Sequence, residues 1–318
     1  MKILITGGAG FIGSATAKKL MDRGDQVIIV DNFNDYYDPS LKRDRISLFL
    51  KGYEDRFILH EGDIRDRAFL EKVFEAEKPD KVIHLAAMAG VRYALKFPTL
   101  YVDVNVMGTT NMLDMAVKYE VKNFVYASSS SVYGNNKKLP FSETDSVDTP
   151  ISPYAATKKA TDLIAHVYSH IYKLPTTGLR FFTVYGPWGR PDMGVFKFVE
   201  KIILGEPIDV YNHGDMRRNF TYIDDIVSGT IVALDANLPY TIMNIGGDSA
   251  VPLLDYIAAV EEASGKTAEK KLLPMPPGDM QSTVADISKL KSLGWKPTTS
   301  IQEGVPHFVK WYQEYYQK

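Results

Sequence analysis

Residues 1–13 read MKILITGGAGFIG, a short apolar run that is followed at once by a glycine-rich turn. Gly7, Gly10 and Gly13 follow the spacing G-x-x-G-x-x-G. Without side chains, such a turn can be tight and a ligand can approach its backbone closely. The stretch predicts a strand that leads directly into a helix, whose N-terminal amides and partial positive charge suit a pyrophosphate. It therefore predicts a dinucleotide site at the first strand–helix turn.

The same alternation of strand and helix continues to about residue 180. Short β-branched runs that are apolar throughout alternate with amphipathic segments of helical length, as in a parallel sheet buried between helices. The expected strands are Ile3–Ile5, Val27–Val30, Phe57–His60, Lys81–Leu85, Phe124–Ala127 and Thr177–Leu179. The expected helices lie near residues 11–23, 66–77, 99–119 and 152–172. This order predicts an α/β fold of Rossmann type with a doubly wound parallel sheet.

The pattern changes after residue 180, where glycine and proline interrupt shorter predicted elements. We expect residues 1–180 to form the dinucleotide-binding domain and residues 181–318 to form a smaller α/β C-terminal substrate domain. Residues 222–245 are expected to return to the main sheet. The run LLPMPPGD at 272–279 is expected to be a loop, because its prolines lack a backbone donor.

The composition excludes several classes of protein. The 318 residues are 45% hydrophobic, and 37 Lys+Arg against 39 Asp+Glu leave no basic surface for nucleic acid or an anionic membrane. With no cysteine there is no disulfide, no cysteine-ligated metal and no thiol nucleophile. No apolar run is long enough to span a membrane, and the first residues do not have the pattern of a signal peptide. We therefore expect a cytoplasmic protein.

Two carboxylates follow the second and third strands. Asp31 is placed to accept hydrogen bonds from the hydroxyls of an adenosine ribose and to repel a 2′-phosphate, which favours NAD over NADP. Lys42 and Arg43 would weaken that preference if they folded over the ribose. Asp63 has two interpretations, as an acceptor for the adenine amino group or as the N-cap of the helix at 66–77.

A tyrosine and a lysine stand four residues apart, on one face of the helix expected at 152–172. Tyr154 has an ordinary pKa of about 10 and is a weak base, but the charge of Lys158 and of an oxidised nicotinamide ring favours its ionised form. The serine run at 128–131 lies at the end of the fifth strand, where ligands bind in such sheets, and a hydroxyl there can hydrogen-bond the same substrate oxygen. Tyr154 and Lys158, with a hydroxyl of this run, are therefore the predicted catalytic groups.

On these motifs the chain resembles the extended short-chain dehydrogenases/reductases, in particular their nucleotide-sugar epimerase and dehydratase group. Within that group it is most similar to the UDP-glucuronate 4-epimerases. The resemblance spans nearly the whole chain and rests on TGGAGFIG, DNFNDYYDPSLKRDR, HLAAMAGVRYA, SSSSVYG, YAATK, RFFTVYGPWGRPDM and MRRNFTYIDDI.

The resemblance implies NAD-dependent 4-epimerisation of a UDP-sugar acid, with Ser129, Tyr154 and Lys158 matching the catalytic residues of the family. Tyr154 would take the proton of the sugar 4-hydroxyl while C4 is oxidised by the cofactor, the 4-keto sugar would turn over, and reduction on its other face would follow. Ser130, Ser131 and Thr183 would bind the uronate carboxylate in a geometry that prevents loss of carbon dioxide. Arg218, Arg190 and Arg217 are candidates for the diphosphate.

The full set of predicted contacts follows from the motifs and the resemblance together. The predicted cofactor-binding residues are Gly7, Gly10, Phe11, Ile12, Gly13, Asp31, Asn32, Asp63, Ile64, Leu85, Ala86, Ala87, Asn105, Tyr154 and Lys158. The predicted substrate-binding residues are Arg92, Ser129, Ser130, Ser131, Thr183, Arg190, Arg218 and Asp279, the last as the acid that binds the uridine ribose.

Three other functions remain open from the sequence. A UDP-glucose 4-epimerase differs mainly at Thr183 and in the loops that carry Arg92 and Arg190. A UDP-glucuronate decarboxylase shares the oxidation step, but no acidic residue stands in the stretch 129–132 where such enzymes use one. A protein that only senses NAD would have no use for a tuned base, which argues against that class.

Several other features receive structural interpretations. No metal site is predicted: His166 and His170 lack a third ligand, and Asp224 with Asp225 is expected to cap a helix. The aromatic tail 311–316 is expected to be a packed helix, and Asp35–Pro39 a surface loop near the adenosine with a possible role as a lid. The helices at 99–119 and 152–172 are expected to form a homodimer interface, as the resemblance implies.

Overall fold

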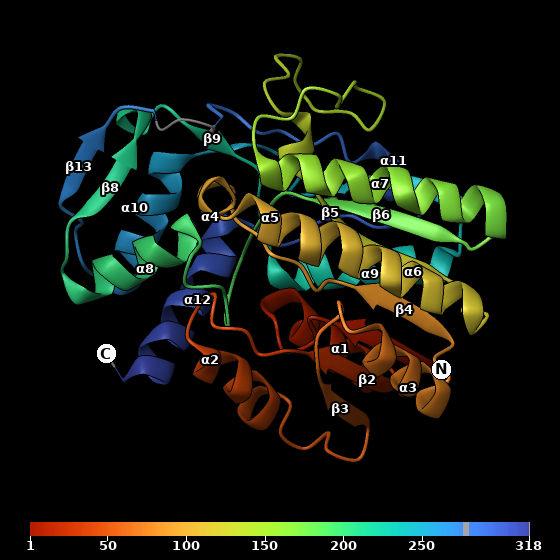
Figure 1. Ribbon diagram of the computed structural model, residues 1–318. Coiled ribbons are helices and arrows are strands. Elements are labelled where there is room, and N and C mark those ends of the chain that lie inside the picture. Colours follow the sequence, from red (N-terminus) through yellow and green to blue (C-terminus); the bar gives the residue numbers. More distant parts are fainter. Residues whose placement is uncertain (276–279, 318) are drawn as a thin grey trace.

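A parallel sheet of seven strands with helices on both faces forms the centre of the computed structural model, which describes residues 1–275 and 280–317 (Figure 1). Every pairing in this sheet is parallel. The strand order β3-β2-β1-β4-β5-β6-β11 reverses direction between β1 and β4. The strands are β1 (Lys2–Thr6), β2 (Gln26–Asp31), β3 (Phe57–Glu61), β4 (Lys81–His84), β5 (Phe124–Ser129), β6 (Thr176–Phe181) and β11 (Tyr240–Ile245). The predicted doubly wound sheet is confirmed.

The predicted strands and helices of the first 180 residues are all present. Each predicted strand is extended by one to three residues, except that β4 ends one residue earlier, at His84. The helices expected at 11–23, 66–77 and 152–172 are α1 (Phe11–Asp22), α3 (Arg67–Glu77) and α7 (Pro153–Tyr172). The helix expected at 99–119 is split into α5 (Pro98–Tyr101), the π-helical segment η2 (Val102–Met107) and α6 (Gly108–Lys118).

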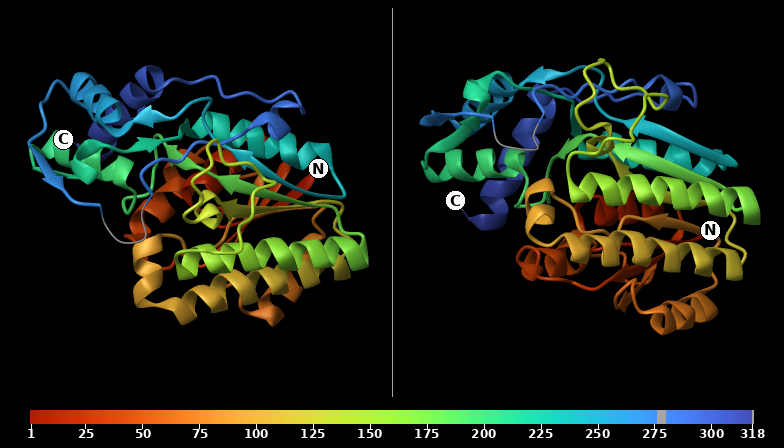
Figure 2. Two further views of the ribbon diagram at one scale, coloured as in Figure 1. Left: turned by 90° about the horizontal axis from the view of Figure 1, so that it is seen from above. Right: turned by 45° about the horizontal axis from the view of Figure 1, so that its top comes forward.

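The two faces of the sheet pack against different helices. Helix α1 packs against α9 (Ile223–Ala236) on one face, while α3, α6 and α7 pack together on the other. Figures 1 and 2 show α6 and α7 side by side along that second face. Alternate residues of a strand point to opposite faces, so Ile3 and Ile5 join the first core and Leu4 joins the second.

The remaining elements lie mostly at the carboxyl edge of the sheet. Strand β11 follows α9 and pairs with β6, so this stretch of the later chain is part of the main sheet. Three two-stranded pairs lie beside it: β7 (Thr183–Tyr185) with β10 (Phe220–Tyr222), β9 (Arg217–Arg218) with β12 (Val251–Pro252), and β8 (Ile208–Tyr211) with β13 (Lys270–Leu273). The helices of this region are α8 (Gly194–Leu204), α10 (Leu253–Ser264) and α12 (Ile301–Tyr316), which pack against one another. The short helical segments are α2 (Pro39–Asp44), η1 (Arg45–Phe49), α4 (Val91–Lys96), η3 (Ser130–Tyr133), η4 (Asn212–Gly214) and α11 (Ser288–Lys291).

One sequence interpretation of this region is wrong. Residues 272–279 were expected to be loop throughout, but Leu272 and Leu273 belong to β13 and pair with Val210 and Tyr211. The prolines begin only at Pro274, so the backbone donors that β13 needs are all present.

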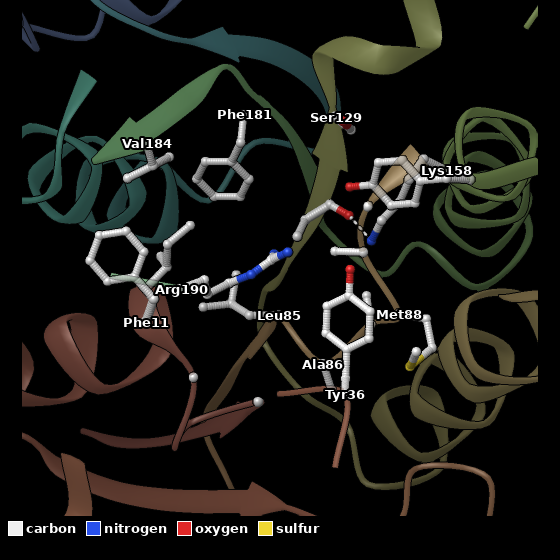
Figure 3. Close-up of a pocket in the computed structure, with 18 of the residues that line it drawn as sticks. Phe11, Tyr36, Leu85, Ala86, Met88, Ser129, Lys158, Phe181, Val184 and Arg190 are labelled. Atoms are coloured by element: carbon white, nitrogen blue, oxygen red, sulfur yellow. Dashed lines mark hydrogen bonds between the residues drawn. The ribbon is translucent and has the colours of Figure 1, made fainter. Parts of the chain in front are cut away.

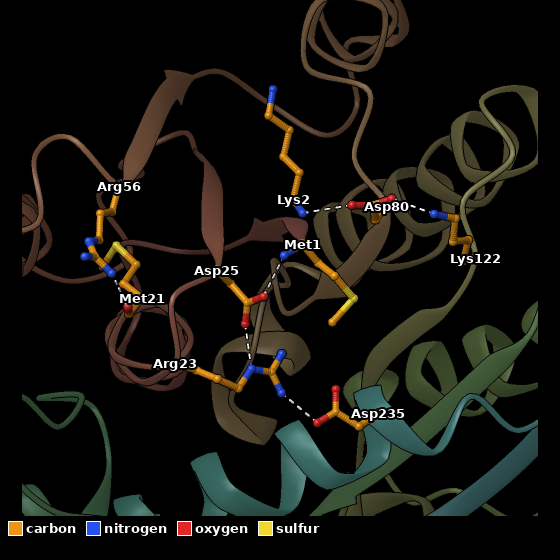
Figure 4. A network of polar contacts seen from close by, with 9 residues as sticks. All are labelled: Met1, Lys2, Met21, Arg23, Asp25, Arg56, Asp80, Lys122 and Asp235. Carbon is orange, nitrogen blue, oxygen red and sulfur yellow. Dashed lines mark hydrogen bonds and ion pairs between the residues drawn. The ribbon is translucent and has the colours of Figure 1, made fainter.

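The amino edge of the sheet is held by a network of charges (Figure 4). Asp25 accepts hydrogen bonds from the N-terminal amine at 2.9 Å and from Arg23 at 2.6 Å, and Arg23 also reaches Asp235 in α9. Asp80 accepts from the backbone N–H of Lys2 and from the Lys122 ammonium. These contacts fix the starts of β1, β4 and β5 and leave the opposite, carboxyl edge for a site.

No helix in the described part of the chain is both long and apolar enough to cross a membrane.

Candidate active site

A cavity of about 470 Å³ lies at the carboxyl edge of the sheet. It follows the point where the strand order reverses, between the loops after β1 and β4, which is where ligands bind in sheets of this kind. Most of the predicted site residues line it: Gly7, Gly10, Phe11, Ile12, Gly13, Asp31, Asn32, Asp63, Ile64, Leu85, Ala86, Ala87, Ser129, Ser130, Ser131, Tyr154, Lys158, Thr183, Arg190 and Arg218. The structure therefore brings residues from across the first 218 positions to one cavity.

The glycine turn has no room for side chains. A Cβ on Gly13 would lie 2.1 Å from the carbonyl oxygen of Gly7, and a Cβ on Gly10 would lie 2.9 Å from the same atom. Gly7 has φ +68°, a conformation that favours glycine. Helix α1 begins directly after this turn, and the amides of its first turn have no acceptor within the helix. The residues present thus fit a dinucleotide, whose pyrophosphate would approach the bare backbone.

Asp31 ends β2 at the wall of the cavity. Its carboxylate accepts from the backbone N–H of Ala9 at 3.1 Å and of Phe33 at 2.9 Å, and burial raises its pKa. Lys42 also lines the cavity, with its ammonium bound to Asn34, whereas Arg43 forms two hydrogen bonds to Glu61 and does not line it. Because the guanidinium is engaged elsewhere, the arrangement is consistent with the predicted preference for a ribose without a 2′-phosphate.

The structure rules out one of the two interpretations of Asp63. The N-cap of α3 is Asp66, whose side chain accepts from the backbone N–H of Phe69, so the interpretation of Asp63 as the N-cap is wrong. Asp63 lines the cavity and accepts from Asn32 at 2.9 Å. Hydrogen bonds from Arg65 hold the pKa of Asp63 at about 2. An ionised acceptor stands where the adenine end of a dinucleotide would lie.

Ser129, Tyr154 and Lys158 meet at the centre of the cavity. Helix α7 places Tyr154 and Lys158 on one face, and the Lys158 ammonium donates to the carbonyl of Ala127 at 2.8 Å (Figure 3). Burial lowers the pKa of Lys158 to about 8. Burial raises the pKa of Tyr154, and a hydrogen bond with Ser129 opposes that shift. Among the protein's own groups, burial outweighs this hydrogen bond and the charge of Arg190, so the pKa of Tyr154 lies above its ordinary value.

Hydroxyl groups gather beside this centre. Ser130 and Ser131 belong to η3, which starts where β5 ends, and the Ser129 hydroxyl accepts from the backbone N–H of Ser131 at 3.1 Å. Thr183 begins β7 and lines the same cavity. Together they offer several neutral donors to one substrate oxygen or carboxylate.

A contact across the cavity was missed by the sequence analysis. Arg190 forms two hydrogen bonds to Asp192, at 3.0 and 2.5 Å, and Tyr36 donates to the same carboxylate at 3.1 Å. Figure 3 shows Tyr36, Arg190 and Lys158 pointing toward the middle of the cavity. Burial would raise the pKa of Asp192, but Arg190 outweighs it and keeps that pKa low. In the loop 35–39, Tyr36 and Tyr37 line the cavity, while Asp35 and Asp38 are exposed as expected of a surface loop.

This hydrogen-bonded contact had only a weak signal in the sequence. The segment 31–45 stood out as specific, but nothing in it indicates a partner some 150 positions later. The same is true of Arg45, a fully buried guanidinium that donates to the carbonyls of Ala9, Trp188 and Gly189. Arg45 thereby ties the glycine turn to the loop that carries Arg190.

Three predicted residues are not brought to the cavity by the described part of the structure. Asn105 is buried and hydrogen-bonds both backbone groups of Met88, so it supports the cavity wall from behind. Arg92 is exposed, with its guanidinium 4.8 Å from the centre of the Tyr211 ring. Arg217 is exposed beside Arg218 and bonds the carbonyl of Ala250. Asp279 lies outside the described residues.

The two pairs that resemble metal ligands have structural contacts. His166 and His170 stack with ring centres 6.1 Å apart, and no group of three metal-binding side chains occurs among residues 1–275 and 280–317. Asp225 was expected to cap α9, but that helix has no side-chain cap. The Asp225 carboxylate instead accepts from the backbone N–H groups of Thr298 and Thr299, because the C-terminal segment folds back over this turn.

Comparison with known proteins agrees with this geometry. The family described as "NAD dependent epimerase/dehydratase family" matches residues 3–246. "UDP-glucuronate 4-epimerase 4" of Arabidopsis thaliana is 48% identical over 99% of this chain and 76% of its own length. The crystal structure of the UDP-glucuronic acid 4-epimerase of Bacillus cereus with UDP-glucuronic acid and NAD has a TM-score of 0.92 at 36% identity, covering 99% of this chain and 100% of that one. The UDP-glucose 4-epimerase of Thermus thermophilus with NAD has a TM-score of 0.89 at 31% identity, covering 98% and 99%. The chain belongs to the NAD dependent epimerase/dehydratase family.

Proposed function

We propose that the protein is an NAD-dependent UDP-glucuronate 4-epimerase, which interconverts UDP-glucuronate and UDP-galacturonate. The observation that carries this proposal is the meeting of Ser129, Tyr154 and Lys158 with the hydroxyls of Ser130, Ser131 and Thr183 in one cavity. The similarity to proteins named for this activity, over nearly the whole chain, supports it. NAD bound along the glycine turn would serve as the oxidant and then the reductant of each cycle, so no net redox change follows.

The protein's own side chains transfer one proton from the sugar and back to it. The phenolate oxygen of Tyr154 takes the proton of the sugar 4-hydroxyl as C4 is oxidised, and returns it when C4 is reduced. The Ser129 hydroxyl donates a hydrogen bond to the 4-oxygen of the sugar and holds that oxygen near the Tyr154 phenol. The ammonium of Lys158, fixed by the carbonyl of Ala127, stabilises the phenolate and can hydrogen-bond the ribose of the nicotinamide.

The carboxylate of the sugar must also be held so that the 4-keto intermediate does not lose carbon dioxide. A 4-keto uronate is a β-keto acid, which loses carbon dioxide when its carboxylate aligns with the carbonyl π system. Ser130, Ser131 and Thr183 can hold that carboxylate in both sugar orientations without the fixed geometry of a bidentate arginine. We therefore assign these hydroxyls to substrate binding, with Arg218 at the wall of the cavity for the diphosphate.

Residues 1–180 with 222–245 would hold the cofactor, and the rest of the chain would hold the UDP-sugar. A cytoplasmic location stays a prediction.

We also propose a homodimer formed by α7 and η2 with α6. Leu163, Val167 and Ile171 are spaced by four on α7 and are 56%, 46% and 59% exposed, and Met107 at the end of η2 is 57% exposed. Such a stripe fits a second copy of the same surface. Leu163→Glu is expected to give monomers in light scattering, whereas Leu48→Glu, at an equally exposed position off this face, is not.

The test of the activity compares four sugars. Purified protein is given UDP-glucuronate, UDP-galacturonate, UDP-glucose and UDP-galactose, with products separated and carbon dioxide measured. Interconversion of the two uronates without carbon dioxide is expected. Conversion of the neutral sugars alone would establish a UDP-glucose 4-epimerase, and a pentose with carbon dioxide would establish a decarboxylase. Thr183→Ala and Ser131→Ala are expected to lower the selectivity for uronates.

A further inference from the structure

One face of α7 carries three ionisable side chains in a row. Tyr154, Lys158 and Asp162 are spaced by four residues, which places them one above another along the helix. The reaction described above uses the first two. Asp162 is only 2% exposed, below the floor of the cavity, and has no part in that reaction.

Asp162 lies one helical turn beyond Lys158 on the same face of α7, and the two side chains contact neighbouring positions of the sheet. The Lys158 ammonium contacts the carbonyl of Ala127, and the Asp162 carboxylate accepts from Arg180 at 3.2 Å. Arg180 is paired in the sheet with Ser128, the residue after Ala127. The ammonium and the carboxylate therefore lie over neighbouring positions of the same two strands.

The pair of Asp162 and Arg180 is fully enclosed. Both side chains are 2% exposed, and Arg180 also donates to the hydroxyl of Tyr133 at 3.1 Å with its guanidinium 5.0 Å from the ring centre. Removing two charges from water is costly, and a buried ion pair is often no more stabilising than apolar side chains of similar size. Stability alone is thus a weak reason for charges at this place.

We propose that Asp162 is a positioning residue for the proposed epimerisation: paired with Arg180, it keeps the Lys158 ammonium charged behind Tyr154. The row Lys158, Asp162 and Arg180 alternates in sign and leaves one net positive charge beside the phenol. Burial lowers the pKa of Lys158, and Asp162 is the charged group that opposes this effect. Burial likewise raises the pKa of Asp162, which the charge of Arg180 opposes.

The other titratable groups around this row do not change charge near neutral pH. His84 on β4 stays uncharged because burial lowers its pKa to about 3, and burial raises the pKa values of the surrounding tyrosines. Across the cavity, Arg190 and Asp192 remain a charged pair. These groups are Tyr101 on α5, whose pKa burial also raises, Tyr126 on β5, Tyr133 in η3, Tyr240 on β11, His84, Arg190 and Asp192.

The test is the pH dependence of kcat in Asp162→Asn. Loss of the anion makes the field at Lys158 and Tyr154 more positive, so both limbs of the profile are expected to move to lower pH by about one unit, with KM unchanged. A role in stability alone would lower the melting temperature and the height of the profile without moving it. The control is Asp225→Asn, since Asp225 is also a buried carboxylate, at 3% exposure, and holds Thr298 and Thr299 far from the row.

A second measurement does not depend on turnover. The ionisation of Tyr154 is followed by ultraviolet absorbance, with Tyr154→Phe in each background as the blank, and its midpoint is expected to fall in Asp162→Asn. If wild-type protein left UDP-glucuronate unchanged, the proposed function would fail while this titration still tested Asp162. If Asp162→Asn did not fold, the pair Asp162→Asn with Arg180→Met removes both charges, and a smaller shift in the same direction is expected. A folded variant whose profile and titration match wild type would overturn the proposal.

Discussion

Replacing Gly13 by alanine is predicted to separate cofactor binding from the rest of the fold. The added Cβ would lie 2.1 Å from the Gly7 carbonyl oxygen and 2.8 Å from the Cα of Gly8, and both atoms belong to the backbone. Real Cβ atoms do not approach closer than 3.0 Å, so the turn and α1 must move apart by at least 0.9 Å, the difference between 3.0 and 2.1 Å. No side chain can rotate to relieve the contact.

The expected cost follows from this displacement. Overpacking of a closed site costs about 1–3 kcal/mol, and about 1.4 kcal/mol corresponds to a tenfold change in affinity. The Kd for NAD is therefore expected to rise roughly ten- to a hundredfold, because the amides that face the pyrophosphate move with the helix. The melting temperature is expected to fall by about 2–6 °C.

The assay measures NAD binding at equilibrium and thermal unfolding by circular dichroism. Gly194→Ala is the matched control, because Gly194 starts α8 and a Cβ there would meet no atom within 4 Å. That variant is expected to keep the wild-type Kd and melting temperature. Wild-type NAD affinity in Gly13→Ala would refute the assignment of this turn to the pyrophosphate.

Three further predictions concern single side chains. Lys158→Met is expected to lower kcat roughly 10²–10⁴-fold with a smaller change in KM, and an unchanged kcat in steady-state kinetics would contradict its role. Asp31→Asn is expected to weaken NAD binding about tenfold and to reduce the preference for NAD over NADP. Equilibrium binding of both cofactors would show both effects. For Asp25, burial would raise the pKa, but hydrogen bonds from the N-terminal amine and Arg23 lower it below its ordinary 3.8. Its stabilisation is therefore fully present above pH 3.8 and is lost as the pH falls through the lowered pKa. Asp25→Asn should lower the melting temperature at pH 7, and the difference from wild type should shrink as the pH falls below 3.8.

The elements of the first 180 residues could be predicted because their signals are local. A β-branched run such as Val27–Val30 has no polar residue that could face water, so it can only be a strand buried on both faces. The G-x-x-G-x-x-G turn and the spacing of Tyr154 and Lys158 are equally local, and each fixes a geometry by itself. Parallel order then places the ends of β1, β4 and β5 at one edge.

The contacts that could not be predicted join distant segments. Tyr36 meets Asp192 only because two loops distant in the sequence lie side by side at the cavity, and neither loop has a periodic pattern. Asn105 was predicted to contact the cofactor, and nothing local in the sequence indicates that its amide bonds both backbone groups of Met88. Asp225 stands in the first turn of α9, where a cap is common, yet the C-terminal segment supplies its partners. In each case a contact with a distant segment determines what the side chain does, and the local sequence does not indicate that contact.

The central claim is that C4 of a UDP-uronate is oxidised and reduced by the cofactor at this site, while Tyr154 takes and returns the proton of the 4-hydroxyl. The most direct measurement is proton NMR of UDP-glucuronate with the protein and NAD in deuterium oxide. UDP-galacturonate with the original hydrogen retained at C4 is expected, since the hydrogen removed from C4 is the one returned to it. Incorporation of deuterium at C4 or C5, a pentose product with carbon dioxide, or unchanged UDP-glucuronate would contradict the account.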